Sequence, residues 1–312
     1  MEDYPRNLSE LEARFSSEGA CREYLFQLRW PDGYRCPRCG GAKGWPLRSV
    51  LLECGNCGYQ TSVTGTIFQD TRKPLALWFR MMWRVTNQKN GASALGRALG
   101  LGSYKTAWTW LHKLRRAMVR AGRDRLTGSV EVDETYVGGL EEGVRGRQTE
   151  TKALVVIAAQ EDGAGIGRIR MRCVPDASAK SLMAFVEDTV DPGSLIHTDG
   201  WPAYDSAESK GYRHRVTVLS RKKESASELL PSVHRVASLL KRWLLGTHQG
   251  AVSREHLDYY LDEFTFRFNR RTSKSRGKLF YRLVQQAVAA DPVPYKRMVK
   301  CFAPADDAKH NW

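Results

Sequence analysis

Four cysteines near the start of the chain have the spacing of a metal site. The sequence contains Cys36-Pro-Arg-Cys39 and Cys54-Gly-Asn-Cys57, two Cys-x-x-Cys pairs with fourteen residues between them. Two such pairs allow four thiolates to meet tetrahedrally around one Zn²⁺ ion, and because all four positions are taken by protein, the zinc is expected to be structural. Two disulfides are the alternative, but the opening Met1-Glu-Asp-Tyr-Pro has no features of a secretory signal.

Two aspartates in the rear part of the chain could bind a second kind of metal. Asp133 lies in the alternating segment 130–137, and Asp199 follows the short segment 194–198 and precedes Gly200. Carboxylate oxygens are the ligands that hard cations such as Mg²⁺ prefer, and a pair of them can hold ions for phosphodiester chemistry. Each aspartate could instead bind its own local backbone in a turn, so the fold decides between these readings.

The elements after residue 128 bring these two aspartates together. Strands are predicted at 130–137, 153–159, 166–174, 194–198 and 213–219, and helices at 176–190 and 231–245, with a short helix before the last strand. The order β-β-β-α-β-α-β-α is that of the ribonuclease H-like fold, an α/β fold with a mixed sheet. There the fourth strand lies beside the first, so Asp133 and Asp199 are expected to meet, with Glu134 on the opposite face of the sheet.

The front part of the chain is predicted to be helical around the cysteine pairs. Helices are expected at 8–15, 24–28, 74–85, 92–99 and 105–120. The last of these places cations opposite its apolar stripe: Lys105, Lys113, Arg115 and Arg116. A helix, a short turn with glycine and a basic amphipathic helix are typical of a helix-turn-helix that binds DNA. An ordinary three-helix packing module is the alternative.

These segments predict several domains in a chain of 312 residues. We expect N-terminal helices at 1–35, a zinc ribbon at 36–60, a helix-turn-helix at 72–122, a ribonuclease H-like catalytic domain at 128–290 and a tail at 291–312.

The charge of the chain indicates a polyanionic partner. Lysine and arginine total 49 against 34 aspartates and glutamates, which gives a net charge of +15. A basic run in the rear part includes Arg267, Arg270 and Arg271, for which a solvated surface is the alternative to DNA binding. The longest apolar run, 153–159, is far shorter than the ~20 residues of a membrane span, so a cytoplasmic location is expected.

Several motifs together resemble bacterial insertion-sequence transposases of the ISXO type, which carry a zinc ribbon ahead of a DDE-like domain. The resemblance lies in Arg-Trp-Pro-Asp-Gly at 29–33 with the first cysteine pair, Val-Asp-Glu-Thr-Tyr-Val-Gly-Gly at 132–139, His-Thr-Asp-Gly at 197–200, and the segments 234–248 and 263–271. These motifs occur in the same order and cover most of 7–288.

The resemblance implies that Asp133 and Asp199 are the first two catalytic carboxylates. The third position departs from the family, because this chain has His234 where DDE enzymes have glutamate and members of this family often have asparagine. Lys241 lies two helical turns further on and matches the basic residue that often accompanies the third ligand. Neutral imidazole is a softer ligand than carboxylate and would favour Mn²⁺ over Mg²⁺.

Three interpretations of the third position stay open. His234 serves as the third residue, or a glutamate serves instead, or this copy is catalytically inactive. The candidate glutamates are Glu224, Glu228 and Glu263.

The resemblance also implies an activity. Catalytic Mg²⁺ or Mn²⁺ would support cleavage of DNA at the ends of the element, and the freed 3′-hydroxyl would then attack target DNA. The front domains would bind the terminal inverted repeats, with Lys241 and residues 267–271 holding phosphates, and cutting two ends requires at least a dimer. A DNA-binding regulator with an inert rear domain, and a nuclease or resolvase that cannot join strands, are the alternatives.

Overall fold

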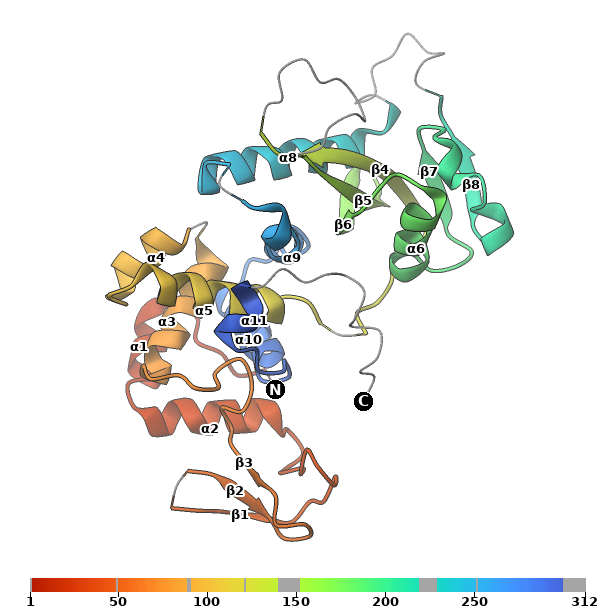
Figure 1. Cartoon of the computed structure of the whole chain (residues 1–312). Helices are drawn as coiled ribbons and strands as arrows, with labels where there is room; N and C mark the ends of the chain where they lie inside the picture. Colours follow the sequence, from red (N-terminus) through yellow and green to blue (C-terminus); the bar gives the residue numbers. More distant parts are fainter. Residues whose placement is uncertain are drawn as a thin grey trace. The chain divides into compact units, whose positions relative to one another are not determined.

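The computed structural model of the chain describes residues 2–48, 50–88, 91–120, 122–139, 152–218, 229–250 and 252–299 (Figure 1). The chain forms two compact units. The first contains residues 1–120 together with 272–312, and the second contains residues 121–271.

The first unit begins with two helices and the zinc ribbon. Helix α1 spans Leu8–Arg14 and α2 spans Glu18–Arg29. The side chains of Asn7 and Ser17 cap them by accepting hydrogen bonds from the amides of Glu10 and Ala20. Three short antiparallel strands follow in the order β1-β2-β3: Gly44–Pro46, Leu52–Cys54 and Gln60–Thr61.

Three further helices follow the ribbon in the first unit. They are α3 at Leu75–Asn87, α4 at Ala92–Leu99 and α5 at Tyr104–Ala117, as the apolar spacing predicts. Gly100 ends α4 in the left-handed conformation, with φ of 61°. Helices α4 and α5 pack closely, since a Cβ atom on Gly96 would lie 3.2 Å from the Cβ of Ala107.

The end of the chain returns to the first unit. Helix α10 spans Arg276–Ala287 and α11 spans Tyr295–Val299. The ring of Phe280 on α10 lies 5.7 Å from that of Phe79 on α3 and 6.1 Å from that of Phe15. The sequence-based boundary at residue 290 therefore differs from the structure, in which the second unit ends at 271 because the apolar face of α10 is buried against the N-terminal helices.

The second unit is built on one five-stranded sheet (Figure 1). Its strands are β4 at Ser129–Val137, β5 at Ala153–Asp162, β6 at Gly165–Val174, β7 at Leu195–Thr198 and β8 at Arg213–Val216. The spatial order is β6-β5-β4-β7-β8. The pairs among β4, β5 and β6 are antiparallel, whereas β7 pairs in parallel with both β4 and β8. This mixed sheet confirms the predicted ribonuclease H-like arrangement, with the fourth strand beside the first.

Helices cover both faces of this sheet. Helix α6, Ala179–Thr189, packs on the face that carries Val130 and Val132, while α8, Pro231–His248, and α9, Leu257–Phe268, pack on the other. The connection from β7 to β8 contains two 3₁₀ turns, Pro202–Tyr204 and Glu208–Lys210, where the sequence predicts a short helix. None of the helices in the described part of the chain is long and apolar enough to cross a membrane.

The segment around α9 closes the edge of the sheet at β6. The Asn269 side chain accepts a hydrogen bond from the Ile169 amide at 2.7 Å and donates one to the Ile169 carbonyl at 3.1 Å. At the other end of α9, the Asp258 carboxylate accepts from the Cys173 amide at 2.9 Å. These side chains take the place of a neighbouring strand, so backbone groups of β6 are satisfied without a sixth strand.

We expect the substitution Asn269→Ala to destabilise the second unit by about 1–3 kcal/mol, because it leaves the Ile169 amide and carbonyl without these partners. Urea unfolding at constant pH measures the change. Asn269→Asp keeps an acceptor for the amide and should lose less. Equal stability of Asn269→Ala and the wild type would show that water replaces the side chain at no cost.

Candidate active site and zinc centre

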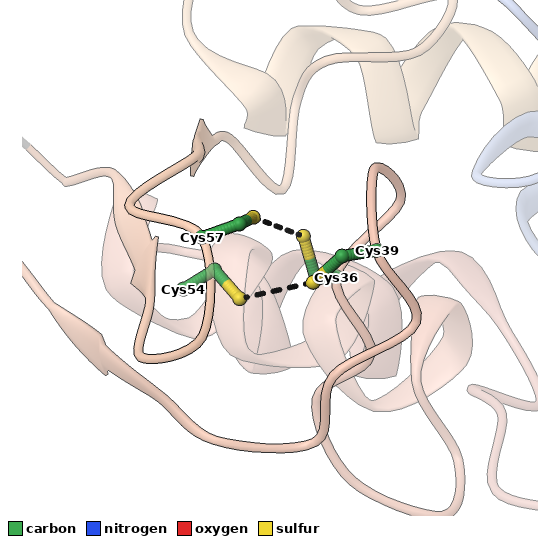
Figure 2. Close-up of side chains that lie close together, drawn as sticks. All are labelled: Cys36, Cys39, Cys54 and Cys57. Carbon is green, nitrogen blue, oxygen red and sulfur yellow. Dashed lines mark hydrogen bonds between the residues drawn. The ribbon is translucent and has the colours of Figure 1, made fainter.

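The four cysteines of the ribbon lie together. The sulfur atoms of Cys36 and Cys57 are 3.7 Å apart and those of Cys39 and Cys54 are 3.6 Å apart (Figure 2). All four sulfurs lie within 4.8 Å of one another. Zn–S bonds of about 2.3 Å in a tetrahedron place the sulfurs about 3.8 Å apart, so the four thiols fit one zinc ion with no open position.

The turns that follow each cysteine pair explain this convergence. Gly40 and Gly58 adopt φ of 72° and 65°, the left-handed region in which a side chain is strained. Their amides donate to the carbonyls of Cys36 and Cys54, at 2.9 Å each. The Asn56 amide also points at the Cys54 sulfur, at 3.4 Å. The glycine after each pair thus allows the chain to fold back around the metal position.

The two predicted carboxylates lie at the same level of neighbouring strands. Glu131 on β4 is paired with His197 on β7 in the parallel register. This is the last residue pair of the two strands, and β7 ends at Thr198, so Asp199 directly follows the strand that lies beside β4; the same register continued by two residues points Asp133 toward Asp199. The Asp199 carboxylate accepts a hydrogen bond from the Trp201 amide at 3.0 Å, which holds it in the turn after β7.

His234, in the first turn of α8, faces Asp133. Its Nε2 atom is 3.7 Å from Oδ2 of Asp133. Partial burial lowers the pKa of His234, Asp199 acts in the opposite direction, and Lys241 lowers it as well. The imidazole is therefore held toward its neutral form, and the 3.7 Å contact is too long for a hydrogen bond. Nε2 is buried and has no hydrogen-bond partner in the described part of the chain.

This pair has the chemistry of a divalent-metal site. Two atoms that each bind one ion at about 2.1 Å can be at most about 4.2 Å apart, so the separation of His234 and Asp133 fits one shared ion. A neutral imidazole with a buried, unpaired nitrogen is also the form that binds metal. Asp199 is further away: among the residues that the structure describes, the four cysteines are the only group of three or more possible ligands within 4.8 Å of one another.

Two lysines accompany this site. Burial lowers the pKa of Lys241, Lys152 lowers it further, and Asp133 acts in the opposite direction. Lys241 and Lys152 are thus near enough to interact with each other, and Lys241 is near enough to interact with Asp133. Lys152, which immediately precedes β5, has no sequence signal that marks it, because only the pairing of β4 with β5 brings it to this end of the sheet.

Helix α8 is fixed to the central strand by a buried carboxylate. Glu131, only 2% exposed, accepts hydrogen bonds from the amides of Ser232 at 2.8 Å and Val233 at 3.0 Å. Burial raises the pKa of Glu131, while the bonds from Val233 and Ser232 counteract this rise. These amides are in the first turn of α8, so Glu131 orients the helix that carries His234 toward the strand that carries Asp133.

Glu131 is not among the predicted site residues, although the sequence carries a signal for it. It lies two residues before Asp133 and so shares its face of the strand, between buried valines. A carboxylate in such a place must find donors.

The neighbouring Glu134 lies on the other face of β4, as the alternation predicts. Its carboxylate accepts a hydrogen bond at 3.2 Å from the hydroxyl of Tyr204, which is fully buried. Burial raises the pKa of Tyr204 well above its usual value, and the nearby carboxylates of Glu134, Asp133 and Asp199 raise it further. Tyr204 therefore stays a neutral donor to Glu134.

Of the three alternative third ligands, the described residues include only Glu263. Glu263 is 1% exposed and binds Arg267 on the same helix, with N···O distances of 2.9 and 2.7 Å. Glu224 and Glu228 lie outside the described residues.

The predicted DNA-binding cations of α5 differ in exposure. Lys105 is exposed, and its Nζ lies 4.1 Å from the centre of the Tyr295 ring. Lys113 donates to the Gln69 carbonyl, and Arg116 is half-buried. The prediction that Arg115 lies opposite the apolar stripe is wrong, because its side chain is 1% exposed and lies 3.3 Å from the His112 ring. It follows Leu111 by one helical turn and so falls on a buried face of α5.

The predicted phosphate-binding cations at 267–271 are engaged within the second unit. Arg267 is held by Glu263, and Arg270 stacks on the ring of Phe266 at 4.0 Å. Arg271 donates to the carbonyls of Gly167 at 3.2 Å and Phe268 at 3.0 Å, and also to that of Ile166. These three arginines, predicted to bind DNA with a solvated surface as the alternative, therefore make contacts within the protein, and those of Arg271 reach β6.

The fold and the site together define a ribonuclease H-like protein that also carries a four-cysteine zinc ribbon. Residues 16–60 match the transposase zinc-ribbon domain family, and residues 125–269 match the ISXO2-like transposase domain family. The chain therefore carries two transposase domains, a zinc ribbon and an ISXO2-like domain, which confirms the resemblance seen in the sequence.

Known proteins similar to the chain include other products of mobile elements. An uncharacterized protein in transposable element ISH50 of Halobacterium salinarum is 27% identical over 275 residues, covering 81% of this chain and 91% of the relative. The crystal structure of the Mos1 mariner paired end complex with Mn has a TM-score of 0.26 and 14% identity, covering 67% of this chain and 72% of that chain. A pre-cleavage Mos1 transpososome has the same TM-score and identity, covering 71% and 62%.

The four-thiol zinc centre can be tested by substituting one of its cysteines. We expect one zinc per chain in the wild type and its loss in Cys54→Ser, with the ribbon becoming sensitive to protease, because strands of two or three residues cannot stay folded without the metal. Metal analysis and limited proteolysis measure both effects. Cys173→Ser, outside the cluster, should keep one zinc; retention of zinc by Cys54→Ser would refute the four-thiol site.

The contact between Glu131 and α8 can be tested by removing the carboxylate. Glu131→Ala leaves two buried amides without an acceptor, so we expect a loss of about 2–5 kcal/mol in the free energy of unfolding. Glu131→Gln keeps an oxygen acceptor and should lose less. Urea unfolding measures the loss, with Glu208→Ala on the exposed 3₁₀ turn as control. A change below about 0.5 kcal/mol in Glu131→Ala would contradict the role.

Proposed function

We propose that this transposase cleaves DNA strands at the ends of its element and joins them to target DNA, using a divalent-metal site formed by Asp133, Asp199 and His234. The observation that carries this proposal is the approach of Nε2 of His234 to Asp133, because this buried nitrogen has no hydrogen-bond partner among the described residues. Asp199 follows the end of β7, the strand beside the one that carries Asp133. His234 takes the place of the glutamate that DDE enzymes have.

The residues of the site have distinct tasks in this proposal. Bound Mg²⁺ or Mn²⁺ would polarise the phosphate and lower the pKa of water. Asp133, Asp199 and His234 hold the ions, and Glu131 keeps α8 in place. In cleavage, water attacks the phosphorus, the bond to the 3′-oxygen breaks, and a 3′-hydroxyl and a 5′-phosphate result. In joining, that hydroxyl attacks a target phosphorus, and the bond from this phosphorus to the 3′-oxygen of the target strand breaks, which leaves a 3′-hydroxyl on the target. No serine, tyrosine or cysteine nucleophile is needed.

The proposal extends to DNA binding and assembly. Helices α3 to α5 have the order of a helix-turn-helix, with Lys105 exposed at the start of α5 and Arg116 half-buried further along. We propose that this segment and the zinc ribbon bind the terminal inverted repeats. Cutting two ends of one element requires two active sites, so the working form on DNA is a dimer or a larger assembly.

The test is cleavage and joining of DNA that carries the flanking repeats, with Mg²⁺ or Mn²⁺. We expect Asp133→Ala, Asp199→Ala and His234→Ala to lower the cleavage rate by more than about 100-fold. Loss of a residue that only hydrogen-bonds to a metal ligand costs about 10- to 100-fold, and loss of the ligand itself should cost more. His234→Glu should recover more activity with Mg²⁺ than His234→Ala does, because carboxylate oxygen is the harder ligand.

Glu134→Gln is the matched control, because this neighbouring carboxylate lies on the opposite face and the amide still accepts from Tyr204. It should cleave at a rate close to the wild type. Wild-type cleavage in His234→Ala together with an inactive Asp133→Ala would exclude His234 as the third ligand. Binding of the repeats by the wild type without cleavage under either metal would support a DNA-binding regulator or an inactive copy instead.

A further inference from the structure

A groove lies beside His234 in the second unit. Its volume is about 670 Å³, and it runs between one side of α8 and the turn that joins β5 to β6. The α8 wall contains His234, Arg235, Ser238 and Arg242, and the turn contributes residues 164–166. The groove therefore opens directly next to the proposed metal ligand.

The groove is positively charged. Arg235 and Arg242 are exposed and lie seven residues apart, two helical turns or about 10.5 Å along α8. Within the parts of the chain that the structure describes, neither has a hydrogen bond or an ion pair. The described lining contains no carboxylate. Two arginines at this spacing and free of acidic partners suit two phosphates, since the guanidinium fork binds phosphate oxygens in pairs.

Both walls are held in place. Glu131 anchors the start of α8 through two backbone amides. On the other side, Arg271 binds the carbonyls of Ile166 and Gly167 at the start of β6. Each wall also carries an apolar side chain, Leu239 on α8 and Ile166 on the other side. A groove with anchored walls, separated cations and apolar side chains in its lining fits a sugar–phosphate backbone, which alternates charged and less polar parts.

We propose that this groove holds the DNA strand next to the phosphate that is cut, with Arg235 and Arg242 as positioning residues that bind two of its backbone phosphates. The proposal rests on the proposed function, because it uses His234 as the reference point of the reaction. Arg235 and Arg242 then bind the phosphates near the site in place of residues 267–271, because the three arginines of that segment bind other parts of the protein.

The first experiment compares the full-length double variant R235Q/R242Q with the control R213Q/R254Q, which removes the same charge from exposed positions outside the groove. Affinity for DNA carrying the flanking repeats is measured at several salt concentrations. Loss of two phosphate contacts should make the slope of log K against log salt shallower by about 1.4 to 1.8. Cleavage at saturating DNA should fall about tenfold, because the strand is no longer aligned.

Further variants separate this role from a structural one. R235K/R242K keeps the charge and should recover most of the salt slope, while thermal unfolding of all variants should match the wild type. In a second experiment, S238C in the groove should form disulfide cross-links with DNA that carries a thiol tether on the backbone beside the cut site. S209C, on an exposed turn outside the groove, should not.

The outcomes distinguish this proposal from the proposed function. A wild-type salt slope and cleavage rate in R235Q/R242Q, or equal cross-linking of S238C and S209C, would overturn the groove as a strand-binding site and leave the metal site standing. A wild type that never cleaves, but whose S238C variant cross-links and whose arginine variant has the shallower slope, would overturn the proposed catalysis and leave the groove standing.

Discussion

The arrangement of the second unit depends on one buried carboxylate. Taking Glu131 out of water is costly, and the raised pKa of this group shows that its hydrogen bonds do not fully offset the burial. The two amides that it satisfies belong to the first turn of α8, where the helix has donors without partners of its own. The result is a direct link from the central strand to the helix that carries His234, Lys241, Arg235 and Arg242.

The positive charge of the chain serves two separate purposes. On α9 and just after its end, arginines bind a buried glutamate and aromatic rings, and Arg271 also binds the carbonyls at the start of β6, which links this segment to the sheet. On α8, Arg235 and Arg242 have no partner within the described residues and remain available. Composition alone cannot separate these uses, because a cation that binds a phosphate and one that binds a carbonyl are the same residue type in the sequence.

The first unit is built from segments that lie far apart in the sequence, residues 1–120 and 272–312. Its aromatic core joins Phe15 and Phe79 from the front of the chain to Phe280 from α10, after the whole second unit has intervened. Gly277 at the start of α10 permits this close approach, because a Cβ atom there would collide with the Pro5 carbonyl. The first unit therefore needs both ends of the chain to complete its core, which makes its folding depend on contacts that are distant in sequence.

The sequence by itself determined the zinc ligands, the order of strands and helices, and the place of the fourth strand beside the first, because ligand spacing, residue periodicity and strand order are local or topological properties. It also placed His234 on the helix that crosses the site. Only the tertiary structure decided that Arg115 is buried, that α9 seals the edge of β6, and that Glu131 and Lys152 belong near the site. These facts depend on which surfaces meet, and burial and partnership of a charged side chain are set by neighbours that lie far away in the sequence.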